Sequence, residues 1–190
     1  MACPVLRSAK TWTAAFLVIF GGFVIQAASA QAVPCLALHS ATVSPTLQKQ
    51  ATELQQKVEA GPFYNEMLRR FGKPKSCELK TDGESIALSF GFRQDAHLDA
   101  RMDSSIESSE QSAELRGLSQ RTALMLLKKA EKDLYGPDGC GIDWGRPQDV
   151  PIENQKGSHA AVFRGDSCNC QGRVIYRGVS VVGFRLSSAC

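Results

Sequence analysis

Histidine and recognisable catalytic motifs are scarce in this chain. The sequence contains three histidines, His39, His97 and His159, and no two of them stand at the spacing of metal ligands. A catalytic base, a nucleophile partner or a metal site would need one of them, and surface or structural roles are more common for histidine. Nucleophile-elbow, phosphate-loop and calcium-loop motifs are also missing. The sequence therefore favours a protein that is not an enzyme, and it predicts no cofactor.

Net charge is small as well. Residues 1–30 carry Arg7 and Lys10 and no acid, which leaves 20 of the 22 Lys and Arg against 19 Asp and Glu in the remainder, a net charge of +1. A nearly neutral chain is not typical of proteins that bind nucleic acid or an anionic membrane surface. We therefore expect no nucleic-acid partner.

Long apolar runs are missing beyond the N-terminal segment. There, the basic residues Arg7 and Lys10 precede the apolar stretch 14–25, and the small residues Ala28-Ser29-Ala30 follow it, which is the organisation of an export signal. The run is shorter than the ~20 residues that a bilayer core requires. We predict a signal peptide over residues 1–30 and a single periplasmic or secreted domain over 31–190, without a membrane span after cleavage. An uncleaved anchor is the alternative.

Cysteine, in contrast, is well represented, and six of the seven cysteines follow the predicted signal. Export to an oxidising compartment favours disulfide bonds between them. Cys168 and Cys170 stand two positions apart, so in an extended segment both point the same way and do not readily bond each other. The spacing and the predicted elements favour three pairs: Cys35–Cys77, Cys140–Cys170 and Cys168–Cys190.

A second interpretation treats Cys168-Asn169-Cys170 as a soft-metal clamp or a redox pair, since two thiolates on one side of a strand can chelate copper(I) or zinc. Zinc sites usually have a wider cysteine spacing and four ligands, and redox dithiols are typically Cys-x-x-Cys. The even number of cysteines in an exported chain favours structural disulfides.

Helical patterns open the predicted domain. Ser44-Pro45 is a typical helix start, and apolar residues follow at helical spacing up to Val58. Gly61-Pro62 ends that helix, and a second short one is predicted before Gly72. The two helices are expected to form an N-terminal helical hairpin.

Alternating patterns follow. A β-hairpin is predicted around Asp82-Gly83, with apolar residues at every second position of 86–92, and a third strand has Leu98, Ala100 and Met102 inward. The polar stretch 104–112 contains two helix-capping patterns and is expected to begin a long helix that ends at Gly136-Pro137.

The C-terminal part reads as a loop, Tyr135–Pro151, followed by strands at 160–163, 173–177 and 179–186, the last two joined by a turn at Arg177-Gly178. The final strand has apolar groups on both faces, so it is either central and covered on both sides or bulged at Gly183. The sequence has no internal repeat. We predict an α+β fold in which a mainly antiparallel sheet packs with the long helix and the helical hairpin, stabilised by disulfides.

Two groups of residues are candidates for binding. The loop 139–146 presents Asp143, Trp144 and Arg146 on a backbone tied by Cys140, although Trp144 is as well suited to filling the core beneath the long helix. The C-terminal strands are locally basic and favour an anionic polymer or an acidic partner surface, or else are ordinary exposed strands. Their arginines are Arg164, Arg173, Arg177 and Arg185, of which Arg173 and Arg177 are the predicted contacts.

The leading hypothesis is an exported, non-enzymatic domain that binds a protein or a cell-envelope component. Two alternatives remain: a metal-binding or redox protein that uses Cys168 and Cys170, and a hydrolase of envelope polymers that uses His97 or His159 with a nearby carboxylate.

Overall fold

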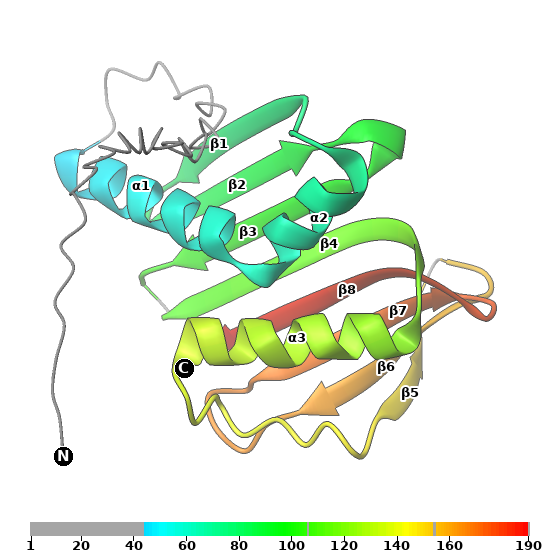
Figure 1. The fold of residues 1–190 in the computed structure, drawn as a ribbon. Helices are drawn as coiled ribbons and strands as arrows, with labels where there is room; N and C mark the ends of the chain where they lie inside the picture. The colour runs from blue at the N-terminus through cyan, green and yellow to red at the C-terminus, as the bar shows by residue number, and fades with distance from the viewer. Residues whose placement is uncertain (1–43, 106, 154, 190) are drawn as a thin grey trace, which may run out of the picture. The chain divides into compact units, whose positions relative to one another are not determined.

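The computed structural model describes residues 44–105, 107–153 and 155–189, all of which belong to the unit Ala32–Cys190. Within these ranges the chain forms three α-helices and one eight-stranded antiparallel sheet (Figure 1). The predicted α+β class and the antiparallel sheet are confirmed. The predicted signal segment, His39, Cys35 and Cys190 lie outside the described residues.

The helices are α1 (Pro45–Ala60), α2 (Pro62–Phe71) and α3 (Gln120–Tyr135). The Ser44 hydroxyl accepts a hydrogen bond from the Leu47 amide at 3.2 Å, which caps α1 as its position predicts. Gly61 alone separates α1 from α2, and the two helices meet at an angle there (Figure 1).

The strands form one continuous sheet in the order β1-β2-β3-β4-β8-β7-β6-β5. A helical segment followed by four antiparallel strands occurs twice along the chain, and the two halves join where β4 pairs with β8. The sequence does not show this architectural repeat, because the matching strands differ in their residues, and β1 and β4 also differ in length from β5 and β8. The bounds are β1 (Ser76–Asp82), β2 (Ser85–Gly91), β3 (His97–Asp103), β4 (Ser108–Leu118), β5 (Gln148–Pro151), β6 (Ser158–Arg164), β7 (Gln171–Arg177) and β8 (Ser180–Ala189).

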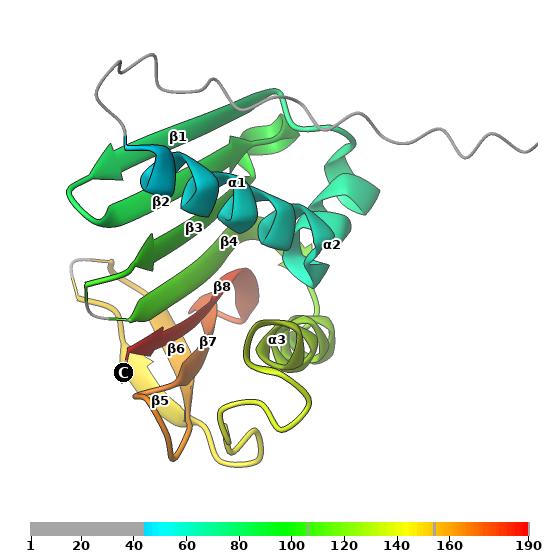
Figure 2. The same ribbon diagram turned by 90° about the vertical axis from the view of Figure 1, so that its left-hand side faces the viewer.

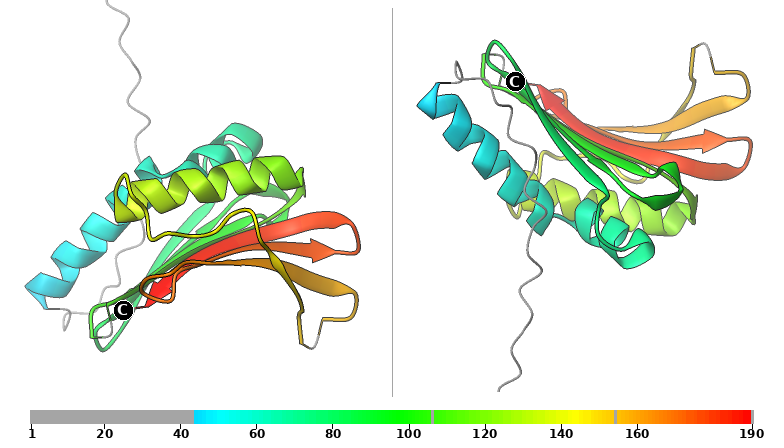
Figure 3. Two further views of the ribbon diagram at one scale, coloured as in Figure 1. Left: turned by 90° about the horizontal axis from the view of Figure 1, so that it is seen from below. Right: turned by 90° about the horizontal axis from the view of Figure 1, so that it is seen from above.

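All three helices lie on the same side of the sheet (Figures 2 and 3). α1 and α2 contact β2 and β3, and α3 lies across β7 and β8. Aromatic rings link the layers: Phe63 of α2 meets Phe184 of β8 edge to face, with ring centroids 4.6 Å apart, and Tyr64 meets Phe90 of β2 at 5.0 Å. The main core therefore lies between the helices and one face of the sheet.

The prediction of a long helix beginning at residues 104–112 is wrong. Residues 108–118 form β4, and α3 begins at Gln120 with Ser119 as its cap, whose hydroxyl accepts from the Thr122 amide at 3.1 Å. The inward residues of β4 alternate through Gln111, Ala113 and Leu115, and the register then shifts before Leu118. This irregularity places two leucines three positions apart, which imitates a helical pattern.

β8 is central in the sheet, and its two-faced apolar pattern arises from a bulge. Ile175 pairs with Gly183 and Tyr176 pairs with Val181, so Val182 is the extra residue between them. A Cβ atom on Gly183 would lie 2.9 Å from the carbonyl oxygen of Ala113. Close approach of β4 at this bulge therefore requires glycine, in agreement with the second of the two alternatives for this strand.

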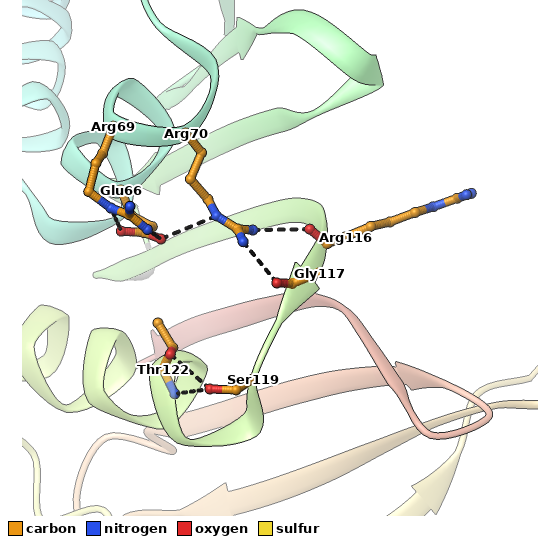
Figure 4. A network of polar contacts seen from close by, with 7 residues as sticks. All are labelled: Glu66, Arg69, Arg70, Arg116, Gly117, Ser119 and Thr122. Atoms are coloured by element: carbon orange, nitrogen blue, oxygen red, sulfur yellow. Dashed lines mark hydrogen bonds and ion pairs between the residues drawn. The ribbon is translucent and has the colours of Figure 1, made fainter.

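A buried acid and two arginines connect α2 to the junction between β4 and α3 (Figure 4). Arg69 donates two hydrogen bonds to the Glu66 carboxylate, at 2.9 and 2.7 Å. Arg70 lies 3.5 Å from the same carboxylate and donates to the carbonyl oxygens of Arg116 and Gly117, at 3.0 and 2.8 Å. Arg70 therefore holds the end of β4 against α2.

This network predicts acid sensitivity. The hydrogen bond from Arg69 lowers the pKa of Glu66, and the positive charges of Arg69 and Arg70 add to the effect while burial opposes it. A lowered pKa in the folded state stabilises the protein above the pKa of the unfolded chain, and this contribution is lost as the pH falls through the folded value. We expect Glu66→Gln to lower the free energy of unfolding by about 1 to 2 kcal/mol at neutral pH, and by progressively less below about pH 4.

Urea unfolding of both proteins across this pH range measures the effect. Glu53→Gln is the matched control, because Glu53 pairs with Lys49 at 3.9 Å with both side chains more than half exposed, and such pairs contribute little. A difference between wild type and Glu66→Gln that stays constant down to about pH 3 would contradict the assignment.

Candidate functional site

The face of the sheet opposite the helices, here called the helix-free face, carries mostly polar and charged side chains. Among the described residues no helix packs against it (Figures 2 and 3). In each strand, the residues that alternate with the core residues point to this face. In β3, for example, Asp99 and Arg101 are exposed and alternate with the buried Leu98 and Ala100. The outward direction predicted for these β3 residues agrees with their exposure.

The middle of this face is occupied by two charged residues in adjacent strands. Arg101 of β3 stands directly opposite Glu110 of β4, and Glu110 accepts a short hydrogen bond from Arg185 of β8. A shallow hollow of about 430 Å³ lies beside them toward β7, and another of about 340 Å³ toward β1. Both hollows include Arg101 and Glu110 in their linings, so they form one interrupted groove across the strands.

The two ends of this groove differ in chemistry. Besides Arg101 and Glu110, the hollow toward β7 presents one further charged residue, Asp103, and several hydroxyl and amide groups, among them those of Ser108, Asn169, Gln171 and Ser187. The hollow toward β1 has alternating charges, from Glu78, Lys80 and Asp99. Together the linings reach from β1 to β7, five strand spacings or about 24 Å.

Three arginines form a cluster beside the hollow toward β7. Arg173 of β7 stands directly opposite Arg185 of β8, and Arg164 of β6 is two positions from Val162, which pairs with Arg173. Burial and the positive charges of Arg185 and Arg164 lower the pKa of Arg173. We call Arg164, Arg173 and Arg185 the arginine cluster.

A small apolar patch that is separate from the main core lies next to the cluster, since Val162 of β6 stands directly opposite Arg173. Ala160 and Val162 of β6 are 4% and 3% exposed, although they alternate with core residues and therefore face the helix-free side. Val150 of β5 stands opposite Ala160. Arginine stems commonly cover such apolar surface while their charged ends stay near water.

The structure places Trp144, one of the predicted contacts, on the other side of the sheet. Its ring packs against Phe163 with centroids 5.2 Å apart, and its indole N–H donates to Glu131 of α3 at 2.7 Å. A Cβ atom on Gly172 would lie 2.3 Å from the indole ring, so β7 requires glycine at this position. These contacts match the core-filling alternative for Trp144.

The predicted binding residues therefore divide between two sites. Gly172 faces Trp144, and its neighbour Arg173 points to the opposite face of the same strand. Arg177 is exposed at the end of β7, about 13 Å along the strand from Arg173. Asp143 and Arg146 form an exposed pair in the loop, with Nε and Oδ2 3.8 Å apart. The sheet therefore separates Trp144 from Arg173, and these two side chains cannot contact the same ligand group.

The cysteines of the described region are bonded. Cys140 and Cys170 form a disulfide, as predicted. Cys77 and Cys168 are also disulfide-bonded, and the partners predicted for them, Cys35 and Cys190, lie outside the described residues. A metal clamp of Cys168 and Cys170 would require both of their bonds to be reduced.

The two described histidines lie apart from each other. His97 is exposed at the start of β3, and His159 of β6 stacks on Tyr176 with ring centroids 5.0 Å apart. His159 Nε2 lies 3.9 Å from the Asp149 carboxylate, which is longer than a hydrogen bond. Among residues 44–105, 107–153 and 155–189, no three His, Cys, Asp or Glu side chains gather as a metal site would need.

Comparison of the chain with protein-family models, curated proteins and solved structures found no match. In the described ranges, no helix combines the length and the apolar character that crossing a bilayer requires.

Proposed function

We propose that this protein is an exported, non-enzymatic binding domain, and that its helix-free face binds an extended, polar component of the cell envelope. One observation carries the proposal: a polar groove crosses six neighbouring strands on the face that the helices leave uncovered. The helices α1, α2 and α3 would then serve as the support that buries the other face.

The chemistry of the groove favours a polymer over a small apolar molecule. Its linings contain hydroxyl, amide and charged groups, and no aromatic or large apolar side chain other than Leu88 contributes to either hollow. Pockets for small molecules are usually deep and mostly apolar. A shallow groove about 24 Å long instead suits several repeating units of a chain, each of which makes a few hydrogen bonds.

Retention on immobilised polysaccharides tests this proposal. The probes are alginate, which bears carboxylates, a poly(glycerol phosphate), and neutral dextran. We expect the protein to be retained on at least one of them, and Ser187→Trp to reduce that retention about tenfold or more, because an indole would fill the hollow toward β7.

Met125→Trp is the matched control. Met125 is 61% exposed on α3, on the opposite side of the molecule from the groove. An indole there should leave retention unchanged. Equal retention of Ser187→Trp and the wild type, or retention of the wild type on none of the three polymers, would overturn the proposal.

A further inference from the structure

The arginine cluster is an unusual feature of the helix-free face. Like charges directly opposite each other in an antiparallel pair destabilise a sheet, and Arg173 and Arg185 occupy such positions. Arg164 adds a third charge near them and contributes to the lowered pKa of Arg173. A sequence shaped by folding stability alone would not favour this placement.

Few acceptors within the described residues neutralise the cluster. Arg185 is paired with Glu110, but Arg173 donates to the neutral Gln171 amide oxygen at 2.9 Å and Arg164 to that of Gln148 at 3.3 Å. Three guanidinium groups thus face one carboxylate. The cluster retains an excess of positive charge that a bound anion would neutralise.

Arg173 also has an unused donor. Its Nε atom is buried and has no hydrogen-bond acceptor among the described residues. Buried polar groups without a partner destabilise a folded protein, and those that persist call for an explanation such as an absent ligand. An oxyanion placed over the cluster would accept from guanidinium groups on neighbouring strands, in the geometry that arginine offers to phosphates and carboxylates.

We propose that Arg164, Arg173 and Arg185 bind an oxyanion, a phosphate or carboxylate group, and that Glu110 is the internal carboxylate that this ligand displaces from Arg185. The inference rests on the proposed function, since it names the chemical group that the helix-free face recognises. Glu110 holds Arg185 while the site is empty and competes with the ligand when it arrives. In the free protein, the Glu110 carboxylate therefore occupies the place of the ligand beside Arg185.

This arrangement makes an unusual prediction. Removing the charge of Glu110 frees Arg185 and removes a negative charge that repels the ligand, so Glu110→Gln should bind the oxyanion more tightly than the wild type. Removing the charge of Arg173 should have the opposite effect. A surface whose charges act only through long-range attraction would respond to net charge alone, and much less strongly.

NMR titration of the arginine Nε–Hε signals measures binding directly, with inorganic phosphate and with acetate as probes and sodium chloride of equal ionic strength as the reference. We expect saturable shifts of the Arg173 and Arg185 signals with phosphate, acetate or both. Glu110→Gln should lower the dissociation constant about tenfold, and Arg173→Gln should raise it about tenfold or more.

Arg121→Gln controls for net charge, because Arg121 is exposed on α3, on the helix side of the sheet. It removes the same charge as Arg173→Gln and should leave the dissociation constant unchanged. Arg173→Gln should also unfold at a urea concentration no lower than that of the wild type, since it relieves repulsion, so loss of binding would not come from loss of folding. Shifts with chloride equal to those with phosphate, or weaker binding by Glu110→Gln, would overturn the proposal.

A competition experiment shows whether the bound oxyanion belongs to a polymer or is a free anion. If phosphate at constant ionic strength releases the protein from a retained polymer, the oxyanion belongs to that polymer; saturable binding without release identifies a free anion as the ligand. If no small anion saturates the site while Ser187→Trp still abolishes retention on a polymer, the oxyanion site is wrong and the broader binding function stands.

Discussion

Glu131→Ala is expected to destabilise the protein by about 3 to 5 kcal/mol, a loss that a charged helix residue seldom produces. Glu131 is 6% exposed on α3. Its Oε1 atom accepts from the backbone amides of Cys140 and Ile142 at 3.1 and 3.2 Å, and its Oε2 atom accepts from the Trp144 indole at 2.7 Å. Alanine would leave three donors in or beside the core without an acceptor.

The size of the effect follows from the number of donors that lose their partner. A buried donor without an acceptor destabilises a protein by about 1 to 3 kcal/mol, and hydrogen bonds to charged groups are among the stronger ones. Glu131→Gln should fall between wild type and alanine, because its amide keeps one acceptor and turns a donor toward another N–H. Chemical unfolding in urea measures all three proteins.

Two further variants separate this role from ordinary surface charge. Asp133→Ala removes an exposed acid two positions along the same helix and should change stability by less than about 0.5 kcal/mol. Trp144→Phe removes the indole donor but keeps a ring against Phe163, and its effect should shrink when Glu131 is already alanine. Equal destabilisation by Glu131→Ala and Asp133→Ala would contradict the anchoring role.

Glu131 also marks the limit of what the sequence can predict. Its own helix could be predicted from Ala123, Leu127 and Ala130, which repeat at helical spacing and are buried. The acceptor role could not, because it depends on how the loop at residues 139–146 folds back over α3. Alternation likewise predicted β2 and β3 with their inward residues, whereas the shift before Leu118 concealed β4.

The candidate site shows the same division. The basic character of the C-terminal strands is visible in the sequence, but the partner of each arginine depends on register across the sheet. Arg185 meets Glu110 from a strand 75 positions earlier, and no local pattern connects the two. Trp144 packs over Gly172 of β7. Arg173, the next residue of that strand, points to the opposite face of the sheet, because neighbouring residues of a strand point in opposite directions.

The disulfide holds the same loop that Glu131 anchors, and both act at Cys140. The backbone amide of Cys140 donates a hydrogen bond to the Glu131 carboxylate, and the sulfur of Cys140 is bonded to Cys170, 30 positions away. Cys170 lies immediately before β7, the strand that carries both Gly172 beneath Trp144 and Arg173 in the cluster. One covalent bond therefore connects the loop on the helix side to the strand that presents the proposed binding face.

Replacing Cys140 and Cys170 together with alanine is expected to destabilise the oxidised protein by about 3 to 4 kcal/mol. A closed loop of this length restricts the unfolded chain by roughly that amount in the chain-entropy model, and both cysteines are buried, at 7% and 1% exposure, so alanine also leaves less packed volume behind. Urea unfolding without reductant measures the loss. Val179→Ala, at a 99% exposed position in the β7–β8 turn, should be nearly neutral in the same assay.

The disulfide and Glu131 fasten the same segment, so their contributions should not be independent. If either change detaches the loop from α3, the remaining interaction, the disulfide or the Glu131 carboxylate, stabilises less native structure. The variant that combines Glu131→Ala with the double cysteine replacement should therefore lose less stability than the sum of the two separate losses. Neighbouring sites of this kind commonly couple by about 0.5 to 3 kcal/mol. A strictly additive result would mean that the carboxylate and the disulfide stabilise separate parts of the fold, and that the loop does not fold onto α3 as one unit.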